Sequence, residues 1–352
     1  MIPRPRGSLE LRRGYHSPQL ELEVRLNTNE SPFPPPEGFS RRLAERISKL
    51  SLNRYPDRSY RMVREALGGF VGVGADRIFV GNGSNEVLLN VALAYGGPGR
   101  RAVVFEPTYS LHAHIAAKVS TEVTSLPRSS NYRITVDEYV LPSIETASLV
   151  YLCTPNNPTG IVEDPQDVLR IVAHSRGLVV LDEAYGDFSA QTRANVALMC
   201  DSVISVRTFS KWFSLAGLRF GYSIAHPEVT ATLDEVVLPY HFDQIKQAAV
   251  LTVLEMVEEF DAQSARLVHH REELRRGIAE LGIATLPSST NFLLMLLPGR
   301  DASLLWRRLV ERSVLVRDTT GWPGLPSSLR VTVGSKTENA RFLEAFATVL
   351  SA

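Results

Sequence analysis

Short apolar runs alternate with polar or glycine-rich turns and helix-like segments through the middle of the chain. Five runs are rich in β-branched residues, at 77–80, 102–105, 148–152, 178–181 and 203–206. Strands that are apolar throughout, rather than alternately apolar and polar, are typical of sheets buried on both faces. Their alternation with helical segments predicts an α/β fold with a mostly parallel sheet that is flanked by helices.

Each predicted strand is followed by a cluster of polar or glycine residues. The clusters occupy 81–86, 106–109, 154–160, 182–185 and 210–211. In open α/β sheets ligands bind beyond the carboxyl ends of the strands. Because all five clusters fall at that end, the sequence predicts a ligand site along this edge of the sheet.

The two ends of the chain have a different character. Prolines are dense at 32, 34, 35 and 36, which predicts an extended arm. Beyond residue 240 the pattern predicts helices at 244–260 and 262–281, strands at 292–297, 314–316 and 329–333, and a last helix at 338–350. We therefore expect an arm (1–38) packed on the small domain and on a partner subunit, a large domain (39–240) and a smaller α+β domain (241–352).

Composition narrows the functional classes. The chain has 352 residues, of which 44% are hydrophobic and 22% charged, and its formal net charge of zero argues against nucleic-acid binding. Two cysteines without a Cys-x-x-Cys pair and eight histidines without metal-binding spacing predict reduced thiols and no metal. No apolar run approaches the ~20 residues that span a membrane. The N-terminal residues hold no signal-like apolar stretch, so we expect a cytoplasmic protein with no membrane partner.

Lys211 is the most informative single residue. It is one of only five lysines among 38 basic residues, and it lies among Phe209, Trp212 and Phe213. Burial disfavours an ammonium group, so a lysine here is expected to be less basic than usual and able to form a Schiff base with a carbonyl. The alternative is an amphipathic lysine whose stem is packed and whose amino group lies in water.

Several other polar residues suggest a matching site. Asp182 ends a predicted buried strand, where a carboxylate needs a partner such as a protonated pyridine nitrogen, a helix terminus or a structural cation. Tyr185 and Asn157 could reach a phenolic oxygen of the same ring, although Asn157 could equally serve turn geometry. Arg330, in an apolar strand, could bind a substrate carboxylate or form a structural ion pair.

A phosphate site is the natural interpretation of the segment Gly81-Asn-Gly-Ser-Asn-Glu86. A strand-to-helix turn of this kind presents free backbone N–H groups and the positive end of a helix. Ser210 and Arg219 would add a hydroxyl and a guanidinium group. Tyr109 could stack on a cofactor ring, or it could simply pack.

Taken together, these segments resemble the fold-type I pyridoxal-phosphate aminotransferases of the class II group, and within it the histidinol-phosphate aminotransferases. The resemblance extends from residues 24–30 to 329–334. The segments that carry it are Asn53-Arg-Tyr-Pro-Asp57, Gly81-Asn-Gly-Ser-Asn-Glu86, Thr154-Pro-Asn-Asn-Pro-Thr-Gly160, Asp182-Glu-Ala-Tyr185 and Arg207-Thr-Phe-Ser-Lys211 followed by Gly217-Leu-Arg219.

The resemblance implies pyridoxal 5'-phosphate as the cofactor, a seven-stranded sheet in the large domain and a homodimer. Lys211 would bind the cofactor covalently and act as general acid and base, Asp182 would pair with the pyridine nitrogen, and Tyr185 would reach the phenolic oxygen. The other implied cofactor contacts are Asn157 at the phenolic oxygen, Tyr109 on the ring, Ser84, Asn85, Ser210 and Arg219 at the phosphate, and Tyr55 at the phosphate of the partner subunit. The implied substrate contacts are Arg330, Tyr15, Asn27 and Tyr240.

By the same resemblance the reaction is transamination between histidinol phosphate and 2-oxoglutarate in histidine biosynthesis, with glutamate and imidazole acetol phosphate as the reverse pair. The alternatives are an aminotransferase for an aromatic or cationic amino acid, a decarboxylase of a phosphorylated amino acid, and an inactive binding protein of the same fold.

Two segments depart from the family pattern, Tyr15-His-Ser-Pro-Gln19 and Pro239-Tyr-His-Phe-Asp243. Asp243 could face the substrate and repel a phosphate, or it could cap the helix predicted to begin at Gln244. The resemblance further predicts a cis Asn157–Pro158 peptide bond.

Overall fold

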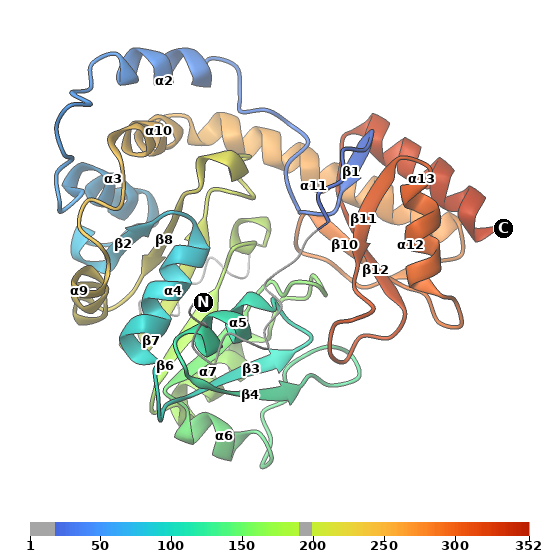
Figure 1. Cartoon of the computed structure of the whole chain (residues 1–352), viewed down its shortest axis with the longest axis horizontal. Helices are drawn as coiled ribbons and strands as arrows, with labels where there is room; N and C mark the ends of the chain where they lie inside the picture. The colour runs from blue at the N-terminus through green and yellow to red at the C-terminus, as the bar shows by residue number, and fades with distance from the viewer. Residues whose placement is uncertain (1–17, 190–198, 352) are drawn as a thin grey trace, which may run out of the picture.

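A computed structural model describes residues 18–189 and 199–351 of the chain. Two sheets organise these residues: a large one in the middle of the chain, and a small one formed by the N-terminal arm and the C-terminal third (Figure 1). The site described below lies where the two meet.

The large sheet has seven strands within the described residues, in the order β2-β8-β7-β6-β5-β3-β4. Their bounds are β2 (Ile78–Gly81), β3 (Arg101–Glu106), β4 (Glu122–Pro127), β5 (Leu149–Cys153), β6 (Leu178–Asp182), β7 (Val203–Thr208) and β8 (Gly221–Ile224). All pairings are parallel except those of β8 with its two neighbours. The predicted mostly parallel seven-stranded sheet is therefore confirmed.

Helices cover both faces of the large sheet, as expected for uniformly apolar strands. In β6, Val180 belongs to the same apolar cluster as Val91 of one helical layer, whereas Val179, on the opposite face, belongs to the cluster that contains Ile171. The first layer contains α4 (Ser84–Tyr95), α5 (Leu111–Lys118) and α9 (Pro227–Val236), and the second contains α6 (Leu141–Thr146) and α7 (Pro165–His174).

The small sheet has five strands within the described residues, in the order β1-β11-β12-β10-β9. These are β1 (Val24–Leu26), β9 (Ala284–Thr285), β10 (Phe292–Leu296), β11 (Val314–Asp318) and β12 (Ser328–Thr332), accompanied by α11 (Val257–Glu280), α12 (Ala302–Val310) and α13 (Lys336–Leu350). Strand β1 pairs in parallel with β11, so part of the arm belongs to this sheet. The predicted strands near 292, 314 and 329 are confirmed.

The helices after residue 240 differ from the sequence prediction at one boundary. Helix α10 (Gln244–Leu254) ends before α11 begins at Val257, whereas the expected break lay near residue 261. Helix α10 packs against α2 (Phe39–Ile47) and α3 (Arg61–Val71) (Figure 1). It therefore lies with elements from before residue 240, and the domain division at that residue stays a prediction.

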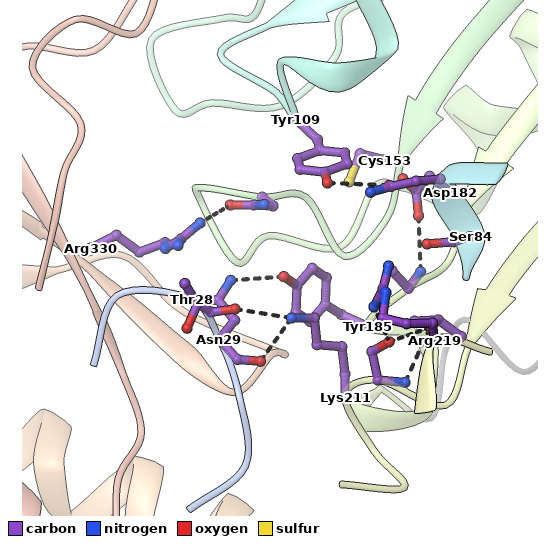
Figure 2. Close-up of a pocket in the computed structure, with 15 residues that line it drawn as sticks. Thr28, Asn29, Ser84, Tyr109, Cys153, Asp182, Tyr185, Lys211, Arg219 and Arg330 are labelled. Atoms are coloured by element: carbon purple, nitrogen blue, oxygen red, sulfur yellow. Dashed lines mark hydrogen bonds between the residues drawn. The ribbon is translucent and has the colours of Figure 1, made fainter. Parts of the chain in front are cut away.

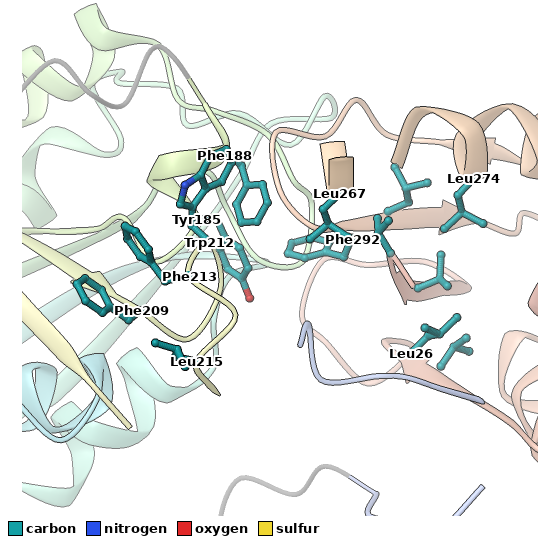
Figure 3. Packing of buried hydrophobic residues seen from close by; sticks show 14 of the residues in the cluster. Leu26, Tyr185, Phe188, Phe209, Trp212, Phe213, Leu215, Leu267, Leu274 and Phe292 are labelled. Atoms are coloured by element: carbon teal, nitrogen blue, oxygen red, sulfur yellow. The ribbon is translucent and has the colours of Figure 1, made fainter. Parts of the chain in front are cut away.

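One apolar cluster joins the two halves and holds the segment around residue 211 (Figure 3). Phe209 and Phe213 pack with ring centroids 4.4 Å apart, and Tyr185 meets Phe292 of the small sheet edge-on at 5.2 Å. Aromatic contacts of this kind fix ring orientation as well as position. No helix in residues 18–189 and 199–351 is long and apolar enough to cross a membrane, and no cluster of metal-ligating side chains was found in the same ranges.

Candidate active site

A pocket of about 140 Å³ lies at the carboxyl ends of the large-sheet strands (Figure 2). Its wall combines residues that follow β2, β3, β5, β6 and β7 with the arm and with β12 of the small sheet. Ten of the predicted site residues line it: Ser84, Asn85, Tyr109, Asn157, Asp182, Tyr185, Ser210, Lys211, Arg219 and Arg330. Sequence positions up to 246 residues apart thus converge. The expectation that ligands bind beyond the strand ends accounts for the residues that follow the large-sheet strands, but not for Arg330, which lies in β12 of the small sheet.

Lys211 projects into this pocket from the turn after β7 (Figure 2). The side chain is half-buried, and its Nζ donates to the backbone oxygens of Thr28 at 3.1 Å and Asn29 at 2.9 Å. Burial, aided by the positive charge of Arg330, lowers the pKa of Lys211 from 10.5 to about 7. A substantial fraction of the amine is therefore neutral near pH 7, as nucleophilic attack on a carbonyl requires.

The anion-binding end of the pocket is built from backbone as much as from side chains. Ser84 opens α4, and the preceding Gly83 has a φ of 88° that an L-residue rarely adopts. Gly221 lets β8 approach closely, since a Cβ atom there would lie 2.2 Å from the Ser84 nitrogen. Arg219 contacts the Ser210 hydroxyl at 3.4 Å. A helix N-terminus beside a guanidinium group suits a phosphate.

Asp182 has a protein partner that the sequence did not reveal. Its Oδ2 lies 2.8 Å from His112 Nε2, both side chains are buried, and Oδ1 accepts from the Ala184 amide at 3.1 Å. His112 in turn stacks on Tyr151. No local pattern pointed to this pairing; the spacing of three between Tyr109 and His112 indicates only that these two rings share one face, and they do meet edge-on.

The turn that follows Asp182 is held by a buried ion pair. Glu183 accepts from the Arg207 guanidinium at 3.0 Å and also from the Ser205 hydroxyl. Each charged side chain is less than one-tenth exposed. A buried pair with this many hydrogen bonds fixes the path of the chain between Asp182 and Tyr185.

Arg330 joins the small sheet to the large one at the pocket. Its guanidinium donates to the Asn157 side-chain oxygen and to the Asn27 backbone oxygen at 2.8 Å. The Asn157–Pro158 bond is cis, so that prediction is confirmed. Arg317 is a second cation that the sequence analysis missed; it lies directly opposite Arg330 in the β11–β12 pairing, and so on the same face.

Three further predicted contacts, Asn27 and Tyr240 for the substrate and Tyr55 for the partner subunit's cofactor, are not among the residues that line the pocket. Asn27 is buried and its amide donates to the Pro18 oxygen, while Tyr15 falls outside the described residues. Tyr55 and Tyr240 stack on each other, with their ring centroids 4.5 Å apart. The geometry thus places Asn27 beside Arg330 through its backbone rather than its side chain.

Asp243 caps a helix. Its carboxylate accepts from the Lys246 amide at 2.8 Å and meets the Lys246 amino group at 3.1 Å. It is not among the residues that line the pocket. Of the two roles considered for it, the structure supports the cap, which removes the expected obstacle to a phosphorylated substrate.

The residues present fit pyridoxal phosphate. One end of the pocket offers the α4 N-terminus and Arg219 to a phosphate, with space that only a glycine at residue 83 leaves open. The other end offers the Asp182 carboxylate to a pyridine nitrogen, and Lys211 lies where it can attack an aldehyde.

Comparisons with known proteins agree with this chemistry. Residues 23–346 match the family model for aminotransferase class I and II. Histidinol-phosphate aminotransferase of Corynebacterium diphtheriae is 38% identical over 97% of this chain and 94% of its own length, and that of Thermobifida fusca is 40% identical over 95% and 92%. The structure of histidinol-phosphate aminotransferase from Sinorhizobium meliloti, in complex with pyridoxal-5'-phosphate, aligns with a TM-score of 0.86 at 25% identity and covers 94% of this chain and 91% of that one. The chain therefore belongs to the aminotransferase class I and II family and is a pyridoxal-phosphate-dependent aminotransferase.

Proposed function

We propose that the protein transfers an amino group between histidinol phosphate and 2-oxoglutarate in histidine biosynthesis. The observation that carries the proposal is a lysine of lowered pKa that shares one pocket with a helix N-terminus and a buried carboxylate, in a chain that matches histidinol-phosphate aminotransferases along nearly its whole length.

Each pocket residue then has a chemical task. Lys211 holds the cofactor covalently and carries the proton to and from the α-carbon of the substrate as general acid and base. Asp182, held by His112, would keep the pyridine nitrogen protonated, while Asn157 and Tyr185, which line the same pocket, would hold the phenolic oxygen. When bound, the cofactor supplies the electron sink for the α-carbon charge.

The substrate side of the pocket is cationic. Arg330 lines the pocket and would bind the carboxylate of an amino-acid donor. Arg317 is not among the lining residues, but it adds a second guanidinium group on the same face of the small sheet. Both favour anionic substrates, which include dicarboxylates and phosphate esters. With Asp243 occupied at a helix cap, this balance of charge supports a phosphorylated substrate.

A homodimer with shared sites is the assembly that we propose. Tyr55 is 79% exposed, and Leu52 and Leu238 on the adjoining segments are 60% and 77% exposed. Large apolar side chains gathered in this way are typical of a protein interface. In a dimer formed there, Tyr55 would reach the cofactor phosphate of the partner subunit.

The decisive experiment compares amino donors. Histidinol phosphate, histidinol, phenylalanine and arginine are each mixed with the holoenzyme, and loss of its visible absorbance reports amino transfer to the cofactor. Histidinol phosphate is expected to react fastest, and preference for a non-phosphorylated donor would overturn the proposal. Lys211→Ala is expected to abolish turnover, and retained transamination by that variant would contradict the assigned role of Lys211.

A further inference from the structure

Asn29 occupies a central and unusual position in the site. It lies in the arm just after β1, is 2% exposed, and has a φ of 57° in the left-handed region. Asparagine tolerates this conformation better than most residues, yet it is held there only when its surroundings require it. Its contacts reach Thr332 and Asn291 of the small-sheet half and Tyr185 and Lys211 of the large-sheet half.

The direction of its hydrogen bonds can be deduced from donor and acceptor types. The Asn29 backbone N–H donates to Thr332 Oγ1 at 3.0 Å. The Thr332 hydroxyl hydrogen is therefore free to point toward the Asn29 side chain, which it meets at 3.1 Å. In this arrangement the Thr332 hydroxyl donates to the Asn29 side-chain oxygen, and the NH₂ group lies on the other side.

The NH₂ group of Asn29 consequently faces Tyr185, whose hydroxyl oxygen lies 2.7 Å away (Figure 2). An amide nitrogen can only donate, so the Tyr185 oxygen accepts this bond and its own hydrogen must point elsewhere. Among the residues that the structure describes, no acceptor for that hydrogen is found, and Tyr185 lines the pocket. The open direction is the pocket itself.

We propose that Asn29 is a positioning residue that directs the Tyr185 hydroxyl hydrogen toward the phenolic oxygen of the cofactor. The inference rests on the proposed roles of Tyr185 and the cofactor and extends them to a residue of the arm. Thr332 sets the orientation of the amide, and the amide sets the direction of the phenol.

The backbone carbonyl of Asn29 also contacts Lys211. Asn291 Nδ2 donates to the Asn29 carbonyl oxygen at 3.0 Å, and this oxygen accepts from Lys211 Nζ as well. Packing of Tyr185 against Phe292 limits rotation of the phenol ring. Substitutions at residue 29 should therefore keep the backbone bond to Asn291 and change only the side-chain donor.

Asn29→Asp is the direct test because it keeps the shape and replaces the donor by an acceptor. The Tyr185 hydrogen should then turn toward the new carboxylate and leave the cofactor oxygen. The phenolic oxygen of the cofactor would then lose the hydrogen bond from Tyr185. The pH at which the visible absorbance of the holoenzyme is half-way through its change is therefore expected to rise by about one unit. A spectrophotometric pH titration measures this shift independently of turnover.

The Tyr185→Phe background separates the effect of the Tyr185 hydrogen-bond direction from the effect of the negative charge introduced at residue 29. The new carboxylate also acts through its charge, and that contribution persists when the phenol hydroxyl is absent. We expect the shift caused by Asn29→Asp to be about one unit larger in the wild-type background than in Tyr185→Phe. Equal shifts in the two backgrounds would overturn the inference while leaving the function intact.

Two further variants complete the design. Asn29→Gly keeps the left-handed backbone accessible and removes the donor, so it should shift the midpoint in the same direction if Asn29→Asp does not fold. Thr332→Ser keeps the orienting hydroxyl and should leave the midpoint of the absorbance titration unchanged. A glycine variant with an unchanged midpoint would refute the role of Asn29, whereas a protein that never binds pyridoxal phosphate through Lys211 would instead refute the proposed function.

Discussion

Lys211 shows how surroundings can set the chemistry of a single residue. Since burial and the Arg330 charge lower its pKa to about 7, the neutral amine becomes the main form above that pH. The rate at which the apoprotein takes up pyridoxal phosphate is therefore expected to rise with pH and to level off above about pH 7. Stopped-flow absorbance would follow the uptake, and a midpoint near the ordinary value of 10.5 would contradict the assignment.

Arg330 can be tested as a cause of this shift. Arg330→Met removes the positive charge that disfavours the ammonium form, so the midpoint of uptake should move to higher pH. Arg317→Met, on the same face of the small sheet, is the matched control and should move it less. Equal movement in both variants would mean that general electrostatics, rather than the Arg330 position, sets the reactivity of Lys211.

The pairing of His112 with Asp182 can be tested through stability. His112→Leu would leave a buried carboxylate with only the Ala184 amide as partner. An unsatisfied buried polar group costs about 1–3 kcal/mol, so the free energy of unfolding of the apoprotein should fall by that amount in a denaturant titration. Adding Asp182→Asn to this variant should recover part of the loss, and simple additivity of the two changes would argue against a direct interaction.

At the scale of single residues, the sequence predicted those polar residues whose immediate neighbours are apolar. Lys211 lies among aromatic residues and Asp182 ends an apolar strand, so each required a chemical explanation. His112 and Arg317 could not be found in this way. Their significance arises from contacts with Asp182, 70 residues away, and across the β11–β12 pairing, neither of which local sequence specifies.

At the scale of elements, the glycine turn before α4 makes a specific prediction. Gly83→Ala would force a side chain into a left-handed φ of 88° and place its Cβ 2.7 Å from Arg219 Nη2. We expect tenfold or greater weakening of pyridoxal phosphate binding, on the order of 1.4 kcal/mol or more. Gly38→Ala shares the same φ but meets nothing within 4 Å, so it should lose stability without losing affinity. Equilibrium titration of both apoproteins provides the comparison.

The cap of α10 gives a second element-scale prediction. Asp243→Ala removes the acceptor for the Lys246 amide and should lower the free energy of unfolding by about 1 kcal/mol, whereas Asp243→Ser keeps a capping oxygen and should lose less. Neither change is expected to alter the ranking of amino donors. A gain in the use of histidinol phosphate by Asp243→Ser would show that this carboxylate faces the substrate after all.

Elements with strong periodicity were predicted well and those fixed by tertiary contacts were not. The apolar strands β5, β6 and β7 follow directly from their β-branched runs. Strand β4 was missed because it is partly exposed, and β8 (Gly221–Ile224) because it holds a single β-branched residue, Ile224. The break between α10 and α11 falls at Glu255 and Met256, with no proline or glycine to mark it.

At the scale of the whole molecule, the site depends on two halves that meet. Thr28 and Asn29 reach the pocket because β1 joins the small sheet through β11, a parallel pairing that no local pattern announces. The sequence indicated an arm and an α+β region, but it could not specify that Arg330 would meet Asn157 from the opposite half. The expectation that ligands bind beyond the carboxyl ends of the strands located the part of the site formed by the large sheet. The part formed by the small sheet depends on tertiary packing, which this expectation does not describe.

The proposed dimer leads to the last prediction. Tyr55 and Tyr240 form an exposed stacked pair, with Leu52 and Leu238 exposed on the adjoining segments. Leu238→Glu should place a carboxylate in the interface, where its desolvation is unfavourable. The protein should therefore shift toward monomer in sedimentation velocity. If Tyr55 completes the phosphate site of the partner subunit, cofactor affinity should fall together with dimer content and recover at high protein concentration.

A matched control separates assembly from surface charge. Tyr139→Asp alters another tyrosine, 81% exposed, on the segment before α6, and it should change neither the oligomeric state nor cofactor affinity. Tyr55→Phe should keep the dimer, because the ring still packs, yet weaken cofactor binding through loss of the hydroxyl. A monomeric Leu238→Glu protein with full activity and undiminished affinity would show that each subunit holds a complete site, and the shared-site dimer would then have to be abandoned.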